Sequence, residues 1–402
     1  MKPSILFVDD EKNILQGLRR MLRGLRDEWE MDFAEGGEAA LAKLSEQSVD
    51  VVVTDMKMPG MNGAELLDRV SELYPQTLRL ILSGEADTEA TFRTVRTSHQ
   101  FLPKPSNSER LIEIIRSALQ RRDAIGDAKL QALVTSVGCL PVSQATHRQL
   151  TDLLDEETAS LDLAADVFSV EPALAAKVMQ LANSAYFGIG DPAVSPKAAA
   201  TRLGWDVLRT LLLNHELALP YPADACKAIY ERSVAQAQET AELAAWIAKQ
   251  EDAAAADVAQ AQLAGLLHCL GRLLLCHQAP EDYAKVPALV TAGQMVDEAE
   301  HQVFGSHHAA LGAYLAQAWA LPPAVVDAIQ HLHEPSNLAA DEDRGIPLLA
   351  AHAALGIVTS QHAVDPKAAA SAQLDADFVA RQGCEAKVDA WVDGWINRGT
   401  AA

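Results

Sequence analysis

The sequence has few cysteines and no long apolar run. Five cysteines stand among 402 residues without a recognisable spacing: Cys139, Cys226, Cys269, Cys276 and Cys384. Such usage suits a reducing compartment better than a disulfide framework. No run approaches the ~18 to 20 apolar residues that would span a bilayer, and the start, MKPSILFVDDE, lacks a signal-peptide pattern. We therefore expect a cytoplasmic protein with no membrane partner.

Positive charge is scarce, above all in the second part of the chain. The net charge is −22, of which residues up to Asp123 contribute −4 (17 Lys and Arg against 21 Asp and Glu) and the remainder −18 (16 against 34). Proteins bind the phosphate backbones of nucleic acids mainly through Lys and Arg. The composition therefore disfavours DNA binding by the second part, and we interpret the negative charge as an aid to solubility.

The first part alternates short apolar runs with helical periodicity. Strands are predicted over residues 5–8, 31–34, 51–53, 78–82 and 100–102, and helices over 13–25, 38–44 and 63–73. Strands that alternate with helices in short units predict an α/β fold with a doubly wound, five-stranded parallel sheet.

Polar side chains follow four of these strands. Asp9 and Asp10 follow the first, Asp55 the third, Ser83 the fourth and Lys104 the fifth. In open α/β sheets, ligands bind outside the carboxyl ends of the strands. Clustered carboxylates are costly without a cation, and their oxygens suit Mg²⁺, while an aspartate can carry a phosphoryl group. The alternative is that these are solvated loop charges, but four matching strand ends favour a phosphoryl-transfer site.

The first part resembles the receiver domain of bacterial two-component response regulators. The resemblance covers residues 1–122 and rests on VDDE at 8–11, TDMKMPGMNG at 54–63, LSG at 82–84 and FLPKP at 101–105. It implies a flavodoxin-like fold, a sensor histidine kinase as partner, and self-phosphorylation and dephosphorylation as the sole catalysis. It also implies that receiver faces within 87–121 could pair in a homodimer. The implied residue roles are Asp55 as phosphoacceptor, Asp9, Asp10, Asp55 and the Lys57 backbone carbonyl as Mg²⁺ ligands, Ser83 and Lys104 as phosphoryl-binding groups, and Phe101 as aromatic switch. Phe101 as a simple core residue has equal weight.

The second part is predicted to be wholly helical. One long helix over 109–134 is predicted to connect the domains, with two helices separated near Gly126 as the alternative. Further helices are predicted over 196–203, 207–213, 225–248, 258–275, 296–318 and 323–332, which together favour an all-α bundle. The chain is divided into a receiver domain (1–122), a helical linker (123–136), an all-α domain (137–340) and a C-terminal helical extension packed on it (341–402).

Eleven of the twelve histidines lie in this second part and raise the question of a metal site. The segment GLLHCLGR at 265–272 is similar to the His-Asp pair of metal-dependent HD phosphohydrolases, but Cys269 follows His268 where a carboxylate is needed. His308 and His333 are candidate remnants of the other ligands. We expect core or capping histidines rather than a metal site.

Residues 137–340 resemble an HDOD domain, a degenerate relative of the HD hydrolases. The motifs are LPV at 140–142, LANSAYFG at 181–188, RLGWDVLRTLLL at 202–213, GLLHCLGRLLL at 265–275, HAALG at 308–312 and WALPPAVVDAIQHLHEP at 319–335. The resemblance implies a non-catalytic module without a cofactor that relays the signal to an unknown downstream protein by contact. The alternative is an HD-type phosphohydrolase or a nucleotide-binding sensor with a degenerate site.

Overall fold

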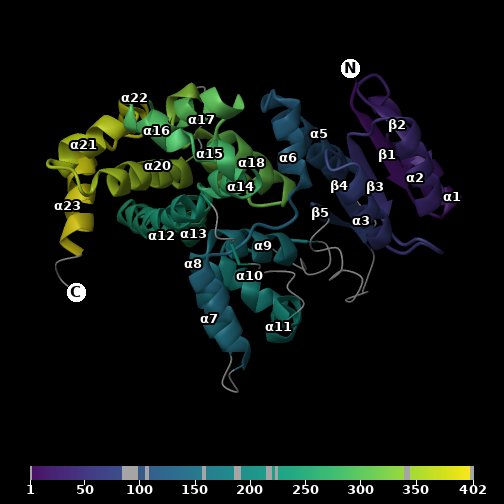
Figure 1. Ribbon diagram of the computed structural model, residues 1–402, viewed down its shortest axis with the longest axis horizontal. Helices are drawn as coiled ribbons and strands as arrows, with labels where there is room; N and C mark the ends of the chain where they lie inside the picture. Colours follow the sequence, from purple (N-terminus) through teal and green to yellow (C-terminus); the bar gives the residue numbers. More distant parts are fainter. Residues whose placement is uncertain are drawn as a thin grey trace.

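The computed structural model describes residues 2–83, 98–104, 108–155, 160–184, 192–213, 220–221, 225–338 and 345–398. A sheet flanked by helices forms an N-terminal domain, and the rest of the chain forms a helical half beside it (Figure 1). The observed classes, α/β followed by all-α, are those predicted from the sequence.

The N-terminal domain is built on a five-stranded parallel sheet in the order β2-β1-β3-β4-β5. Its strands are β1 (Ser4–Val8), β2 (Glu30–Ala34), β3 (Val51–Asp55), β4 (Leu78–Ser83) and β5 (Gln100–Pro103). β1 and β3 are direct neighbours, with Val8 opposite Thr54, and Asp55 lies opposite Leu82 of β4. The carboxyl ends of these strands therefore meet at one edge of the sheet.

Successive side chains of a central strand point to opposite faces of the sheet, and each face has its own hydrophobic core. Val51 and Val53 face α1 (Lys12–Met21) and α5 (Ser108–Ala124), whereas Val52 faces α2 (Gly37–Glu46) and α3 (Gly63–Leu73). A short 3-10 turn, η1 (Arg23–Leu25), follows α1. Strands buried on both faces explain the continuous apolar runs in the sequence.

The connection between the halves is broken, so the predicted single helix over 109–134 is wrong and the two-helix alternative is right. α5 ends at Ala124 and α6 (Ala128–Ser136) begins after a turn. Gly126 lies at φ +77°, which favours glycine, and the Asp127 side chain caps the new helix by accepting from the Lys129 and Leu130 amides. Gly126 and Asp127 therefore turn the chain, although the apolar periodicity of the sequence continues through them.

The helical half contains the remaining elements. They are α7 (Gln144–Asp155), α8 (Leu161–Val170), α9 (Pro172–Ala182), α10 (Pro196–Leu203), α11 (Trp205–Leu213), α12 (Lys227–Gln250), α13 (Ala255–Leu267), α14 (Leu270–Gln278), α15 (Pro280–Tyr283), α16 (Val286–Thr291), α17 (Val296–Phe304), α18 (His308–Ala318), α19 (Pro323–His331), η2 (Pro335–Asn337), α20 (Gly345–Ser360), α21 (Pro366–Gln373), α22 (Ala376–Arg381), η3 (Glu385–Lys387) and α23 (Val388–Arg398).

Two stretches predicted as single helices are each two helices. The 258–275 stretch breaks at His268 and Cys269, between α13 and α14, and the 296–318 stretch breaks at Gly305, which has φ +77°. After the first break Gly271 packs against α18 so closely that an added Cβ would lie 2.0 Å from the His308 carbonyl oxygen. The two breaks therefore let α14 and α18 change direction, so that the two helices pack closely at His308.

In the C-terminal segment, 345–398, helix α20 packs against α12, α13, α19 and α21. Most residues of α20 are buried. Trp391 of α23 is buried, and Trp395 donates its indole hydrogen to Gln361 at 3.0 Å. The two tryptophans therefore anchor α23 to its own half.

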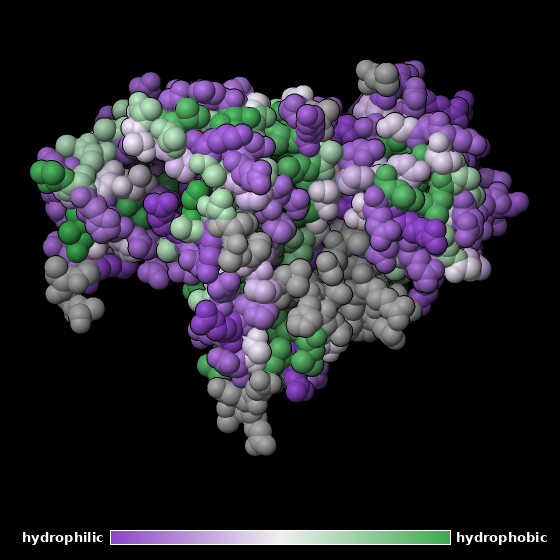
Figure 2. Space-filling model, in the orientation of Figure 1, coloured by the Kyte–Doolittle hydropathy of each residue, from purple (hydrophilic) through white to green (hydrophobic). Residues whose placement is uncertain are grey.

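In the described part of the chain one stretch, Ala255–Gln278, is long and apolar enough to cross a membrane, by length and composition alone. It comprises α13 and α14, and 72% of its apolar window is buried in the protein, as in a core helix. Hydrophilic residues cover most of the surface seen in Figure 2, with apolar patches between them.

Candidate phosphoryl and ligand sites

Three carboxylates converge at the carboxyl edge of the sheet. Asp9 and Asp10 follow β1 and Asp55 ends β3, and their ligand oxygens lie within 4.8 Å of one another. Among the residues that the structure describes, this is the one set of three or more His, Cys, Asp or Glu side chains close enough to hold an ion. An all-oxygen set of this kind fits a hard divalent cation.

Lys104 completes this group from the end of β5. Its Nζ lies 2.8 Å from Asp9 Oδ2 and 2.8 Å from Asp55 Oδ1. Burial raises the pKa of Asp55, and although Lys104 opposes this, the pKa of that carboxyl stays above its ordinary value. Burial lowers the pKa of Lys104, but hydrogen bonds to Asp55 and Asp9 outweigh it and the net direction is up. The ammonium is thus held charged between the two carboxylates.

The backbone of Asp55 is supported by a contact that depends on glycine. Gly63, the first residue of α3, lies so close that an added Cβ would be 2.1 Å from the Asp55 carbonyl oxygen. The Gly63 amide donates to the Met56 carbonyl at 3.0 Å, and Asn62 and Glu65 form a reciprocal cap on α3. The start of α3 thereby fixes the loop that follows Asp55. This role was not predicted, although Asn62-Gly63 before a helical run indicates a helix start in the sequence.

Other predicted site residues are placed only in part. Ser83 ends β4 opposite Pro103, and Phe101 lies in β5, but both side chains are outside the described residues. Lys57 is exposed in the loop after β3. Part of the receiver face expected within 87–121, residues 87–97, also lies outside the described residues. The roles of Ser83, Phe101 and the Lys57 carbonyl stay predictions.

A second polar cluster lies inside the helical half around Glu300 of α17. Glu300 Oε2 accepts from the His308 amide at 2.7 Å and contacts His308 Nδ1 at 2.6 Å, and Tyr283 donates to Oε1 at 2.5 Å. Burial alone raises the pKa of Glu300, but His308, Arg272 and Tyr283 outweigh it and lower the pKa to about 2. Glu300 is therefore a buried, fully paired carboxylate.

The imidazole of His308 links this carboxylate to His333. Their Nε2 atoms lie 2.9 Å apart, and Arg272 Nη2 lies 3.4 Å from the same His308 nitrogen. Two ring nitrogens this close share one proton, so a hydrogen bond joins the two imidazoles. Arg272 thus places a cation beside Glu300, with its Nε 3.7 Å from Oε1.

The other two predicted remnants differ in environment. Cys269 is fully buried with its Sγ toward the Leu266 carbonyl, and burial raises its pKa to about 12, so it stays a thiol. His268 Nδ1 lies 2.7 Å from the Gly265 carbonyl, and burial lowers its pKa to about 3. The structure therefore joins His308 and His333 directly, while Cys269 packs as an apolar residue. Glu300, Arg272 and Tyr283 were not predicted as members of this cluster. Of the three, only Arg272 lies in one of the HDOD motifs, four residues after His268.

The halves meet along the outer edge of the sheet, at β4 and β5. Gln180 of α9 donates to the Ser98 and His99 carbonyls at 3.1 and 2.7 Å, and Gln100 donates to the Gln317 carbonyl of α18 at 2.7 Å. Arg79 of β4 donates to the Thr135 carbonyl of α6 at 3.0 Å, and burial lowers its pKa to about 10. The helical half therefore contacts residues 98–100 directly, a few residues before Lys104.

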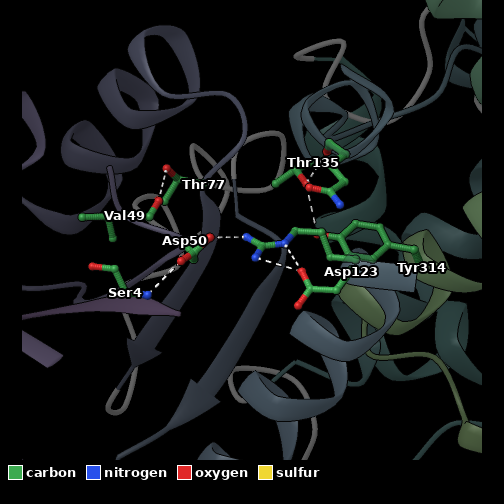
Figure 3. A network of polar contacts seen from close by, with 9 residues as sticks. Ser4, Val49, Asp50, Thr77, Asp123, Thr135 and Tyr314 are labelled. Atoms are coloured by element: carbon green, nitrogen blue, oxygen red, sulfur yellow. Dashed lines mark hydrogen bonds and ion pairs between the residues drawn. The ribbon is translucent and has the colours of Figure 1, made fainter. Parts of the chain in front are cut away.

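Arginines at the end of α5 add a second set of contacts. Arg121 pairs with Asp327 of α19 at 2.8 Å, and Arg122 contacts Asp50 at 2.7 Å and Asp123 at 3.1 Å. Figure 3 shows Asp50 and Asp123 on either side of a guanidinium group, with Thr135 and Tyr314 facing each other nearby at 3.1 Å. These groups tie the amino ends of the strands to the connection between the halves.

Comparison with known families agrees with this geometry. Residues 5–116 match the response regulator receiver domain and residues 140–335 match the HDOD domain. The chain therefore carries a response regulator receiver domain followed by an HDOD domain.

Two curated relatives each match about a third of the chain. The chain is 32% identical over 126 residues to the hydrogenase transcriptional regulatory protein HoxA of Cupriavidus necator, covering 31% of this chain and 26% of that protein. It is 33% identical over 129 residues to the uncharacterized transcriptional regulatory protein YesN of Bacillus subtilis, covering 30% and 34%. The chain thus spans about a quarter to a third of the length of these relatives.

Two solved structures are also similar. The signal receiver domain of an HD domain-containing protein from Pseudomonas fluorescens is 31% identical, with 31% of this chain and 99% of that chain covered and a TM-score of 0.30. The MmoQ response regulator from Methylococcus capsulatus is 22% identical, with 60% and 97% covered and a TM-score of 0.49.

Proposed function

We propose that this protein is a cytoplasmic response regulator in which a sensor histidine kinase transfers a phosphoryl group to Asp55. The observation that carries the proposal is the bridge from Lys104 to both Asp9 and Asp55, beside a third carboxylate from Asp10. Two carboxylates that share one ammonium are oriented toward the same point, where an incoming phosphoryl group would meet both a nucleophile and a cation.

Asp9, Asp10, Asp55 and the Lys57 backbone carbonyl would hold Mg²⁺, since their oxygens match the preference of that ion. The bound ion would neutralise charge on the phosphoryl oxygens. Asp55 would supply the attacking oxygen, and Lys104 and Ser83 would bind phosphoryl oxygens.

Acetyl phosphate with Mg²⁺ tests the phosphoacceptor. The wild-type chain should incorporate one acid-stable, hydroxylamine-labile phosphoryl group, and Asp55→Asn should abolish the labelling. Asp27→Asn, at an exposed carboxylate of the same domain, is the matched control and should label normally. Labelling that persists in Asp55→Asn would place the acceptor elsewhere.

The HDOD half would relay the signal by protein contact rather than by catalysis. Its contacts with Gln100 and Ser98-His99 lie on the segment that leads to Lys104, so a rearrangement around the phosphoryl group would reach α9 and α18 without an intermediary. A pull-down that compares phosphorylated with unphosphorylated protein would reveal a downstream partner. A partner captured equally in both states would argue against phosphorylation control.

The contents of the HDOD cluster support a non-catalytic role. A metal-dependent hydrolase needs several ligands around an ion that generates hydroxide, whereas here Arg272 supplies the cation beside Glu300 and Cys269 stays protonated. Metal analysis of protein purified without chelator, together with turnover of cyclic dinucleotides, tests this. Stoichiometric metal in this half with turnover would establish the hydrolase instead.

A further inference from the structure

The HDOD half contains a cavity of about 340 Å³, partly open to solvent, that the phosphoryl-transfer proposal does not use. It lies between α12, α14, α17, α20 and α21, and its lining includes His268, Arg272, Asp297, His333 and Leu355. The cavity therefore joins the polar cluster around Glu300 to the C-terminal helices.

A buried hydrogen-bond acceptor without a partner lines this cavity. The Gly265 carbonyl can only accept, so the His268 proton lies on Nδ1, and Nε2 carries a lone pair. His268 is 2% exposed, and its Nε2 has no hydrogen-bond partner among the described residues. Buried polar atoms are normally paired, so this nitrogen indicates a ligand that donates a hydrogen bond.

The charged residues that line the cavity indicate which charge the ligand carries. Arg272 contributes one positive charge and forms an ion pair with Glu300 at 3.7 Å, although its buried Nε has no hydrogen-bond partner among the described residues. Asp297, Glu298 and Glu334 line the same cavity with three negative charges. An adjoining cavity shares these three carboxylates and is lined by further histidines, including His301 and His307. The net charge near the cavity is therefore negative and repels phosphate groups.

The rest of the lining is mixed. Met295, Val296, Leu332 and Leu355 contribute apolar surface, and Gln236, His352, Thr359 and Gln373 contribute polar groups. A short chain of methylene groups would bury apolar surface against the first set. The cavity thus combines a buried acceptor, apolar side chains and carboxylates.

We propose that this cavity binds a small aliphatic amine, with one N–H group donating to His268 Nε2 and a positive charge beside Asp297, Glu298 and Glu334. Nucleotides fit less well because their phosphates would meet these carboxylates. A metal ion fits less well because no three His, Cys, Asp or Glu ligands come together here among the described residues. The site is separate from the receiver's acidic cluster, and the proposal does not depend on phosphorylation of Asp55.

Titration calorimetry of the full chain with putrescine tests the proposal, with AMP and Zn²⁺ as alternative probes. We expect one putrescine per chain, with affinity that falls as salt is raised, and no binding of AMP or Zn²⁺ to this cavity. His268→Phe keeps the ring but removes the acceptor, and should weaken binding about tenfold or more. Asp297→Asn should also weaken it.

Matched controls lie outside the cavity. His362→Phe changes an exposed histidine, and Glu281→Gln changes an exposed carboxylate. Both variants should leave the putrescine affinity unchanged. If His268→Phe fails to fold, ring-nitrogen NMR of the wild-type chain decides, because putrescine should shift the His268 Nε2 signal. Absence of binding, binding unaffected by His268→Phe or without that shift, or binding of AMP or Zn²⁺ in place of putrescine would each overturn the proposal.

Discussion

The side-chain amide of Gln100 donates a hydrogen bond to the backbone carbonyl of Gln317 over 2.7 Å. Gln100 begins β5, and Lys104 follows the end of this short strand, where it contacts Asp9 and Asp55. Gln317 lies in α18, the helix that begins with His308. One strand and one helix therefore connect the carboxylate site of the receiver with the polar cluster of the HDOD half.

Removing this hydrogen bond should weaken the coupling between the halves. In the wild-type chain, phosphorylation with acetyl phosphate should change hydrogen exchange in residues 308–318, because β5 is bonded to that helix. Gln100→Ala should reduce the change while labelling of Asp55 continues. Gln120→Ala, at an exposed position of α5, is the control and should behave as wild type. An undiminished change in Gln100→Ala would mean that the signal passes elsewhere.

The ion pair between Arg121 and Asp327 should stabilise the docking of the halves. Both side chains are largely buried, with 20% and 14% exposure, so solvent screens the pair only in part. A double-mutant cycle with Arg121→Ala and Asp327→Ala, measured by denaturant unfolding, should give a coupling energy of about 1 kcal/mol. A coupling energy of zero would show that the docking rests on the other contacts.

Gly63→Ala should disturb the phosphoacceptor without touching its side chain. The new Cβ would lie 2.1 Å from the Asp55 carbonyl oxygen, so the loop after β3 must move. We expect a loss of about 1–3 kcal/mol in unfolding free energy and slower labelling by acetyl phosphate. Gly17→Ala, in α1 with no atom within 4 Å of the new Cβ, should be neutral or stabilise by up to about 1 kcal/mol. Equal behaviour of the two variants would refute the packing argument.

Glu300 should make the stability of the HDOD half depend on pH. Its folded pKa of about 2 lies below the ordinary value of 4.5, so its stabilisation is present above pH 4.5 and is lost as pH falls toward 2. The shift corresponds to roughly 3 kcal/mol. Unfolding of Glu300→Gln should show a large deficit at pH 7 that narrows toward pH 3. For Glu281→Gln, at an exposed site, the difference from wild type should stay small throughout; a constant deficit in Glu300→Gln would contradict the assignment.

Much of the receiver could be predicted because its signals are local. Runs such as Val51–Val53 before Asp55 predict a buried strand with a carboxylate at its end, and parallel strands bring such ends to one edge. Helix boundaries in the second part were less predictable. Periodicity continues through Gly126, Gly305 and the His268-Cys269 pair, whereas the chain turns at each of them.

The sheet, its acidic edge and the helical nature of the second part follow from local patterns, because spacing along one strand or helix dictates which side chains share a face. The folded chain was needed to show that Glu300 and Arg272 join His308 and that His268 Nε2 is buried without a partner among the described residues. It was also needed to show that His99 is bonded to α9 and Gln100 to α18. Those relationships join residues far apart in the chain, and they depend on helix directions that no local pattern encodes.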